Sequence, residues 1–314
     1  MSGETDGVIR ARSLVKRFPG VVAVKGASFT VQRAELFGFV GPDGAGKTTM
    51  FRMLAAVMKP DEGEIRIEDI DAVARPEDMR GRLSYMPQRF GLYEDLTVDE
   101  NIRFYADVFE VPRKLREERS ARLLAASGME NFRDRLAGQL SGGMKQKLGL
   151  TCALIHAPNI VLLDEPTTGV DPVSRRDFWR ILHGLREQGV TIVISTAYLD
   201  EAERCTRLAL LHRGEIRYCE TPDALRRKLP GQMIVVACDA PQSAGRILSD
   251  LPGVLAVRAV GDAVRAMVDD QTLRIPEIER ALAANGFTRA RAERAPATVE
   301  DVFLALLEHE AREG

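Results

Sequence analysis

A glycine-rich stretch, Gly-Pro-Asp-Gly-Ala-Gly-Lys-Thr-Thr at residues 41–49, constrains this chain more than any other feature. It follows the apolar segment 36–40 and leads into a helical pattern that starts near Met50. In such a strand–loop–helix context, G-x-x-x-x-G-K-[ST] is typical of a phosphate-binding loop. The glycines leave successive backbone N–H groups free to surround an anion, and the following helix directs its positive end to the same point. The alternative is a glycine-rich turn that only joins strand to helix.

The side chains of this loop have distinct expected roles. Lys47 supplies a positive charge for the β- and γ-phosphates, and the Thr48 hydroxyl suits a Mg²⁺ ion. The loop is therefore predicted to bind a nucleoside triphosphate through Gly41, Pro42, Asp43, Gly44, Ala45, Gly46, Lys47, Thr48 and Thr49.

Composition narrows the class of protein. The chain has 314 residues, of which 45% are hydrophobic and 29% charged, as expected of a soluble globular protein with two domains. A net charge of -2 gives no electrostatic support for nucleic acid as the main partner. The cysteines show no C-x-x-C spacing, which fits a reduced, cytosolic chain. Residues 1–12 lack the apolar core of a signal peptide, and no apolar run is long enough to span a bilayer, so work at a membrane would need another polypeptide.

A second candidate site element is an apolar run, residues 160–163, that ends in two carboxylates. Asp164 stands at the end of this predicted strand and is suited to hold Mg²⁺ directly or through water. Glu165, one residue on, is the candidate general base that polarises an attacking water. A pair of surface carboxylates at a strand exit is the alternative.

Three further positions remain ambiguous when only the residues are considered. Phe18 lies just before a turn and is compatible with stacking on an adenine ring or with ordinary packing. Gln88 follows a predicted strand, where it is compatible with a contact to Mg²⁺ or the attacking water, or with a solvated loop. Ser141 is a good helix N-cap, and Gly142 and Gly143 leave the first-turn N–H groups open to an anion, although glycines near an N-cap are common.

Taken in this order, the motifs resemble the ATP-binding subunit of an ABC transporter over residues 8 to about 225. Residues 85–88 and 299–303 are similar to drug- and lipid-exporter-type subunits, including tandem multidrug ABC ATPases. The resemblance implies an adenine-stacking Phe18, a Walker A loop at Gly41 to Thr48, a Q-loop at Gln88, a signature at Leu140 to Gly143, Walker B residues Asp164 and Glu165, and a D-loop at Asp171.

The fold that the resemblance implies is an α/β P-loop NTPase core, with an antiparallel β subdomain and an α-helical subdomain at about 91–158, in a domain spanning 8–228. The activity implied is ATP hydrolysis that powers export. Lys47, Gln88 and Glu165 would be catalytic, and Thr48, Gln88 and Asp164 would hold Mg²⁺.

The partners implied by the resemblance are a second ABC domain, in a homodimer or heterodimer, and membrane-spanning permease subunits. Two ABC domains would pair head to tail, with each ATP between one P-loop and residues 141–143 of the other domain. Gln88 and the helical subdomain would pass the motion to the permease. The chain would thus be cytoplasmic and peripheral on the inner face of a membrane.

Two residues depart from the family pattern. Asp43 stands where the family usually has asparagine, and a carboxylate near phosphates is unfavourable unless it points outward. Ala197 stands where the family places a switch histidine that contacts the γ-phosphate; the chain's histidines, at 156, 183, 212 and 309, lie elsewhere. Losing such a contact costs about 2.7–4 kcal/mol of transition-state stabilisation, on the scale of one oxyanion donor. A slowly hydrolysing, ATP-gated binding domain partnered with a competent one is therefore the alternative function.

The tail, residues 232–314, lies outside the ATPase pattern. Its predicted elements follow the order β-α-β-β-α-β, which fits a small ferredoxin-like α+β domain. Thr298 and Asp301 then cap a last amphipathic helix. The tail holds no catalytic constellation, and we expect an accessory domain.

Overall fold

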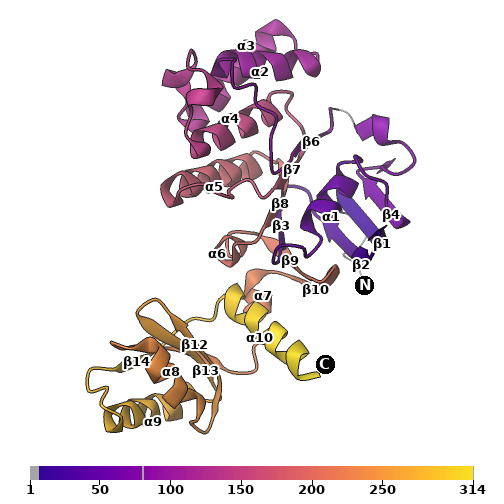
Figure 1. The fold of residues 1–314 in the computed structure, drawn as a ribbon. Coiled ribbons are helices and arrows are strands. Elements are labelled where there is room, and N and C mark those ends of the chain that lie inside the picture. Colours follow the sequence, from indigo (N-terminus) through magenta and orange to yellow (C-terminus); the bar gives the residue numbers. More distant parts are fainter. Residues whose placement is uncertain (1–6, 80, 314) are drawn as a thin grey trace. The chain divides into compact units, whose positions relative to one another are not determined.

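The protein divides into two compact units, Met1–Thr221 and Pro222–Gly314. The computed structural model describes residues 7–79 and 81–313 (Figure 1). This boundary lies a few residues earlier than the one expected from the sequence, which put the end of the ATPase domain at residue 228 and the start of the tail at residue 232. Helix α7 (Pro222–Arg226) belongs to the second unit because it packs against that unit's last helix, α10 (Val299–Glu313).

The first unit contains a six-stranded sheet that is parallel except at one edge. Its spatial order is β10-β9-β3-β8-β7-β6, with β10 antiparallel to β9. Both β3 and β7 are buried along their whole length, which explains their continuous apolar sequences. The strands are β3 (Leu36–Val40), β6 (Leu83–Met86), β7 (Ile160–Asp164), β8 (Thr191–Thr196), β9 (Arg207–His212) and β10 (Glu215–Glu220).

A four-stranded antiparallel sheet, in the order β2-β1-β4-β5, packs against this core. An aromatic cluster joins the two: the ring centroid of Phe39 lies 4.9 Å from Phe29 and 5.9 Å from Phe51. Phe51 belongs to helix α1, so the cluster also anchors the helix that follows the P-loop. The elements are β1 (Ile9–Phe18), β2 (Val21–Val31), β4 (Glu62–Ile67), β5 (Ile70–Asp71), α1 (Lys47–Leu54) and the 3₁₀ helix η1 (Pro76–Met79).

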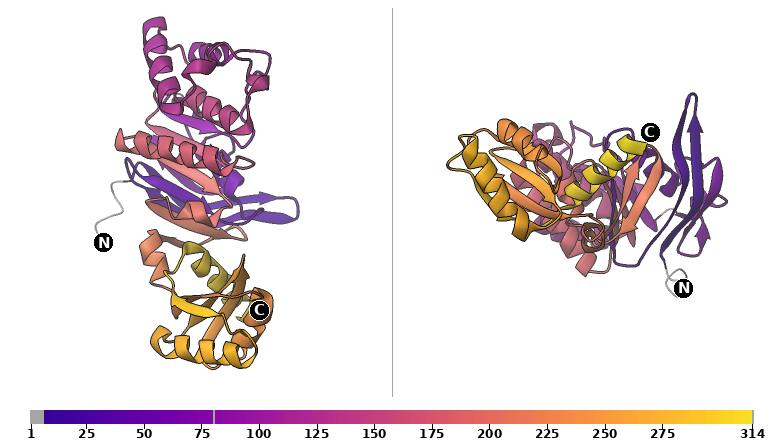
Figure 2. Two further views of the ribbon diagram at one scale, coloured as in Figure 1. Left: turned by 90° about the vertical axis from the view of Figure 1, so that its left-hand side faces the viewer. Right: turned by 90° about the horizontal axis from the view of Figure 1, so that it is seen from below.

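Helices α2, α3 and α4 form a separate helical part with its own apolar core (Figure 1 and Figure 2). A capping box starts α2: the Glu100 amide donates to Thr97 Oγ1 at 3.2 Å, and the Thr97 amide to Glu100 Oε2 at 2.8 Å. The remaining described helices of the first unit, besides α1 and η1, are α2 (Val98–Val108), α3 (Arg113–Ser127), η2 (Glu130–Phe132), η3 (Ala137–Gln139), α4 (Gly142–Leu154), α5 (Pro172–Glu187) and α6 (Leu199–Ala202).

Together these elements confirm the predicted fold class: an α/β core with an antiparallel β sheet and a helical part, and a small α+β second unit. The second unit runs β11-α8-β12-β13-α9-β14, and its antiparallel sheet has the order β12-β13-β11-β14. Helices α8 and α9 share the buried core of this sheet. The elements are β11 (Gln232–Ala237), α8 (Pro241–Ser249), β12 (Val254–Val260), β13 (Ala263–Val268), α9 (Gln271–Ala284) and β14 (Arg291–Arg294).

An ion-pair cluster fastens α10 to the sheet of the second unit. Asp301 accepts from Arg265 Nη2 at 2.7 Å, and from the Thr298 amide and hydroxyl at 2.8 Å. Arg258 also lies near Asp301, at 3.7 Å, and pairs with Glu300. Burial alone would raise the pKa of the Asp301 carboxyl, but the Arg265 and Thr298 hydrogen bonds outweigh it and hold the pKa below its usual value.

Replacement of Asp301 by asparagine should destabilise the second unit in a pH-dependent way. Because the folded pKa of Asp301 is depressed, its stabilisation is present above the unfolded pKa of about 3.9 and is lost as the pH falls through the folded pKa. We expect Asp301→Asn to cost about 3 kcal/mol at pH 7, the lower end for breaking a buried pair, and far less at about pH 2, where the carboxyl of the folded protein becomes protonated.

Urea unfolding at both pH values, with hydrogen-exchange mass spectrometry to isolate peptides from 222–313, measures this cost. Asp262→Asn, at an exposed turn of the same unit, should stay within about 0.5 kcal/mol of wild type. An equal cost at both pH values would contradict the ionic role of Asp301.

Candidate nucleotide-binding site

The P-loop joins β3 to α1 at the carboxyl edge of the parallel sheet. Strand β3 ends at Val40 and α1 begins at Lys47, so residues 41–46 form the connection. Gly46 has φ of 103°, and a Cβ at this position would collide with the carbonyl oxygen of Ala23. Only glycine fits there, because its backbone is left-handed and β2 passes directly behind it.

Lys47 is buried within this loop, with 4% of its surface exposed. Its Nζ donates to the carbonyl oxygens of Gly41 at 2.9 Å and Pro42 at 3.0 Å, and lies 3.0 Å from Glu165 Oε1. Asp43 Oδ1 lies farther away, at 4.0 Å. A buried ammonium group held by carbonyls and a carboxylate is a fixed positive charge at the start of a helix.

Asp164, the last residue of β7, is fully buried. Its Oδ1 accepts from Ser195 Oγ at 2.6 Å and Thr48 Oγ1 at 3.3 Å, and its Oδ2 from the Tyr85 hydroxyl at 3.4 Å. Burial raises the pKa of Asp164 above its usual value, while the Ser195 and Thr48 hydrogen bonds oppose that rise. Burial and the Asp164 charge raise the pKa of Tyr85 to about 12. Asp164 is thus a buried carboxylate whose ionised form a nearby cation would stabilise.

Glu165 stands at the turn that leaves β7. Its φ of 49° is rare for a residue with a side chain, and its amide donates to Ser195 Oγ at 2.9 Å. Its Oε2 accepts from Gln88 Nε2 at 3.1 Å and Thr168 Oγ1 at 3.4 Å. Strain at one residue and hydrogen bonds from two others orient this carboxylate toward Lys47.

A cavity of about 1060 Å³ lies over these groups. Phe18 lines it and is 39% exposed, so it is not a core residue. Asp43 lines it too, but its side chain is 94% exposed, which leaves the carboxylate solvated. Ala197 also lines this cavity, at the end of β8. The predicted residues lining the cavity are Phe18, Asp43, Gly44, Gly46, Lys47, Thr48, Thr49, Gln88 and Glu165.

Other predicted residues start helices outside this cavity. Ser141 caps α4, accepting from the Met144 amide at 3.3 Å. Asp171 caps α5, accepting from the Val173 amide at 3.1 Å and the Ser174 amide at 2.9 Å. The Ser174 side chain, followed by the Ser174 amide, lowers the pKa of Asp171. Gly143 is buried against α5, where a Cβ would collide with Ser174. Within the described part of the chain, Ser141 to Gly143 and Asp171 do not line the cavity that holds Lys47.

Sequence reasoning missed several contributors to the site. Ser195 bridges the Asp164 carboxylate and the Glu165 amide, although it reads as an ordinary strand residue. Tyr198, directly after Ala197, lines the cavity too, and so do Lys25 and Arg213, which lie in segments without a motif. A serine facing the end of a neighbouring strand would have been a weak signal for Ser195; Lys25 and Arg213 carry none.

Comparison with known proteins agrees with this geometry. The ABC transporter family model matches residues 24–168. Nod factor export ATP-binding protein I of Burkholderia lata is 36% identical over 308 residues, covering 96% of this chain and 97% of its own length. This chain belongs to the ABC transporter family of ATP-binding proteins. Daunorubicin/doxorubicin resistance ATP-binding protein DrrA of Streptomyces peucetius, another relative of this ABC protein, is 33% identical and covers 99% of the chain.

One relative is longer than this chain, which aligns with about half of it. The probable multidrug ABC transporter ATP-binding protein YbhF of Escherichia coli (strain K12) is 42% identical over 96% of this chain, which spans only 52% of that protein. Among solved structures, the dimeric bacterial ABC transporter cassette MJ0796 is 27% identical, with a TM-score of 0.62 over 68% of this chain and 98% of its own. Another, an ATP-binding subunit of an ABC transporter, is 29% identical, with a TM-score of 0.64 over 70% of this chain and 92% of its own. Among the helices the structure describes, none has the length and apolar character to cross a bilayer.

Replacement of Lys47 by alanine should weaken nucleotide binding at least about tenfold, because charge-assisted hydrogen bonds contribute about 1.5–3 kcal/mol each. Fluorescence titration with a trinitrophenyl ATP analogue measures the affinity, and circular dichroism checks the fold. Lys114→Ala, at an exposed position of α3, is the control and should bind as wild type does. Equal affinities for Lys47→Ala and wild type would refute the P-loop assignment.

Proposed function

We propose that this protein is the ATP-binding and ATP-hydrolysing subunit that powers an ABC export system. The observation that carries the proposal is the contact between Lys47 and Glu165, 3.0 Å apart at the floor of the P-loop cavity. A phosphate-binding cation and an oriented carboxylate in one cavity are what phosphoryl transfer to water requires. The export role is supported by the relatives' names, which refer to drug resistance and Nod factor export.

Mg²⁺ fits the residues at the end of β7. The Asp164 carboxylate and the Thr48 hydroxyl supply hard oxygen ligands 3.3 Å apart. Because burial raises the pKa of Asp164, a bound cation would stabilise its ionised form. Gln88, 3.1 Å from Glu165, completes the proposed ligands. Mg²⁺ commonly needs only one or two carboxylates beside substrate phosphates, and when bound it would neutralise phosphate charge.

The protein's own groups divide the chemistry among them. Lys47 binds the terminal phosphates, assisted by the amides of Asp43, Gly44 and Gly46 and the N-terminus of α1. Glu165 accepts a proton from the attacking water, while Gln88 and Thr168 hold its other oxygen. Phe18 offers its exposed ring to the adenine.

A second ABC domain completes the site in this proposal. Ser141 and Asp171 are exposed at the starts of α4 and α5, outside the cavity they are proposed to serve. Head-to-tail pairing would bring residues 141–143 of one domain over the P-loop of the other. The dimeric structure of the cassette MJ0796 supports this arrangement. The partner domain is either a second copy or a different ABC protein.

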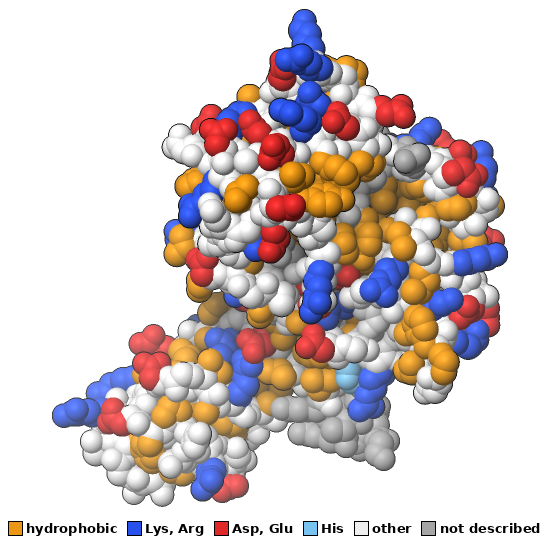
Figure 3. Space-filling view, turned by 45° about the horizontal axis from the view of Figure 1, so that its top comes forward, with side chains coloured by type: hydrophobic (Ala, Val, Ile, Leu, Met, Phe, Trp, Pro, Cys, Tyr) orange, Lys and Arg blue, Asp and Glu red, His pale blue; other side chains and the backbone are white. Residues whose placement is uncertain are grey.

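A membrane-spanning permease is the proposed partner of the helical part. Tyr93 and Phe104 are 44% and 37% exposed and lie in edge contact, 4.6 Å between ring centroids. Val108, one turn beyond Phe104 on α2, is 44% exposed. Figure 3 shows hydrophobic side chains gathered on the surface of the first unit. Exposed apolar clusters of this kind mark interaction sites, and docking here would place the protein on the cytoplasmic face of a membrane.

A slower ATPase is the second candidate function, and Ala197 is the observation that favours it. The methyl group of Ala197 lines the cavity and offers no hydrogen bond to a terminal phosphate. The protein would then bind ATP but hydrolyse it slowly, and a competent partner domain would hydrolyse its own ATP.

Turnover of two variants separates these candidates. Glu165→Gln removes the general base but keeps the Gln88 contact within reach, so we expect turnover to fall at least about a hundredfold with ATP binding retained. In a slow ATPase, Ala197→His should raise turnover by about a hundredfold, the size of one lost oxyanion-type donor. A coupled phosphate-release assay with Mg²⁺ and ATP measures both.

The control for the added histidine is Ala197→Gln, which adds bulk and hydrogen-bonding groups without an imidazole. Brisk wild-type turnover that Ala197→His leaves unchanged would reject the slow-ATPase candidate. Retention of full turnover in Glu165→Gln would reject Glu165 as the base.

The permease contact is tested by affinity purification from detergent-solubilised membranes of the source cells. We expect a polypeptide with several membrane spans, identified by mass spectrometry, to accompany the wild-type protein. Phe104→Asp should reduce its recovery at least about tenfold, since a charge in an apolar contact costs several kcal/mol. Leu273→Asp, at another exposed apolar position, should not. Recovery of ribosomes in place of a membrane protein would contradict the transporter role.

A further inference from the structure

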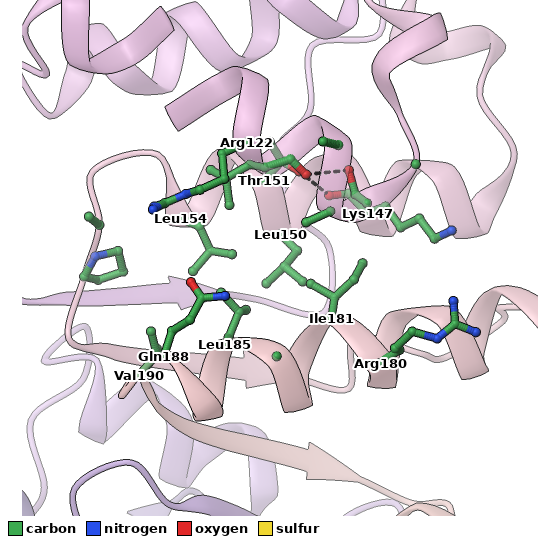
Figure 4. Close-up of a pocket in the computed structure, with 18 of the residues that line it drawn as sticks. Arg122, Lys147, Leu150, Thr151, Leu154, Arg180, Ile181, Leu185, Gln188 and Val190 are labelled. Carbon is green, nitrogen blue, oxygen red and sulfur yellow. Dashed lines mark hydrogen bonds between the residues drawn. The ribbon is translucent and has the colours of Figure 1, made fainter. Parts of the chain in front are cut away.

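A second large cavity, of about 860 Å³, lies among α3, α4 and α5, apart from the P-loop cavity (Figure 4). Its floor and walls are apolar: Leu150 and Leu154 from α4 face Ile181 and Leu185 from α5. Such a volume lined by leucines suits a small ligand, since binding pockets commonly enclose about 300–1,000 Å³. Neither the motifs nor the proposed hydrolysis uses these residues.

The charges around this cavity favour an anion. Its charged lining residues are three cations, Arg122, Lys147 and Arg180, and one carboxylate, Asp177. Asp177 already pairs with Lys147 at 3.4 Å and Arg180 at 3.2 Å. The exposed side chain of Arg122 makes no hydrogen bond or ion pair with any residue that the structure describes. The three cations exceed the one carboxylate, and the Arg122 guanidinium is left to meet an anionic ligand.

Two polar side chains lie at one end of the cavity, and Lys147 and Arg180 lie at the other (Figure 4). In Figure 4, Arg122 extends along the α3 side toward Leu154, and Gln188 rises from the end of α5 near the same place. A guanidinium and a side-chain amide both donate hydrogen bonds to a carboxylate. The leucines between α4 and α5 would then cover an apolar chain attached to it.

The helices that form this cavity also carry the residues of the proposed ATP sandwich. Helices α4 and α5 start in close contact, with Gly143 against Ser174, and the Lys147–Asp177 pair follows along both helices. Farther along, Leu150 and Leu154 of α4 and Leu185 of α5 are buried and form the floor of the cavity. A ligand bound toward the C-terminal ends of α4 and α5 thus acts on the two helices whose N-terminal ends are capped by Ser141 and Asp171.

We propose that this cavity is a regulatory site for a small amphiphilic carboxylate, with its head group on Arg122 and Gln188 and its apolar chain on the leucines of α4 and α5. The ligand would set the spacing of α4 and α5, and with it the position of residues 141–143 relative to Asp171. The binding part of this proposal stands alone, whereas the regulatory part rests on the proposed ATPase function.

Isothermal titration calorimetry of the full chain with sodium decanoate tests the binding part. We expect saturable one-to-one binding to wild type, and at least tenfold weaker binding to Arg122→Ala. Arg113→Ala, an exposed arginine on the same helix outside the cavity, should match wild type. Acetate, which has the head group without the chain, should not bind. Absence of saturable binding up to 5 mM decanoate (roughly the millimolar limit of a useful regulatory affinity), or equal affinity in both arginine variants, would overturn the site.

ATP turnover with and without decanoate tests the regulatory part. We expect at least a threefold change for wild type and Arg113→Ala, and none for Arg122→Ala at the same concentration. Decanoate that binds without changing turnover would overturn the regulatory role. A wild-type protein without any turnover would overturn both that role and the proposed hydrolysis, while calorimetry would still decide the binding site.

Discussion

Parallel pairing of β3, β7 and β8 is the constraint on which the site depends. Val40 lies opposite Thr196 and Asp164 opposite Ser195, so the carboxyl ends of these strands meet at one edge. Strand ends that share an edge place their connecting loops side by side, although those loops are far apart in sequence. The P-loop, the two carboxylates and Ala197 therefore converge without any local signal for their proximity.

Burial makes this edge chemically useful. Asp164 has no exposed surface and Lys47 has 4%, so water screens the interactions of neither side chain. Each is kept there by named partners: Ser195 and Thr48 for Asp164, two carbonyls and Glu165 for Lys47. A charged group that is buried and held by hydrogen bonds needs little rearrangement to meet a substrate of the opposite charge.

Much of the first unit could be predicted because its signals are local. The capping box at Thr97, the N-cap at Ser141 and the apolar run of β7 each involve neighbouring residues, and the structure contains all of them. The sequence also shows that Asp43 and Ala197 depart from the family motifs, but it does not show what these departures do. That Asp43 is solvated and that Ala197 faces the cavity follow from the direction of each side chain, which only the packed chain sets.

The sequence by itself determined the P-loop, the carboxylates that end β7 and the order of elements, because glycine conformation, helix capping and apolar periodicity act over a few residues. Only the tertiary structure decided that Ser195 joins Asp164 to Glu165, that Gln88 reaches Glu165, and that a cavity lies between α4 and α5. These are contacts between segments distant in the chain. Their geometry depends on strand order, register and helix packing, and no short stretch of sequence specifies these.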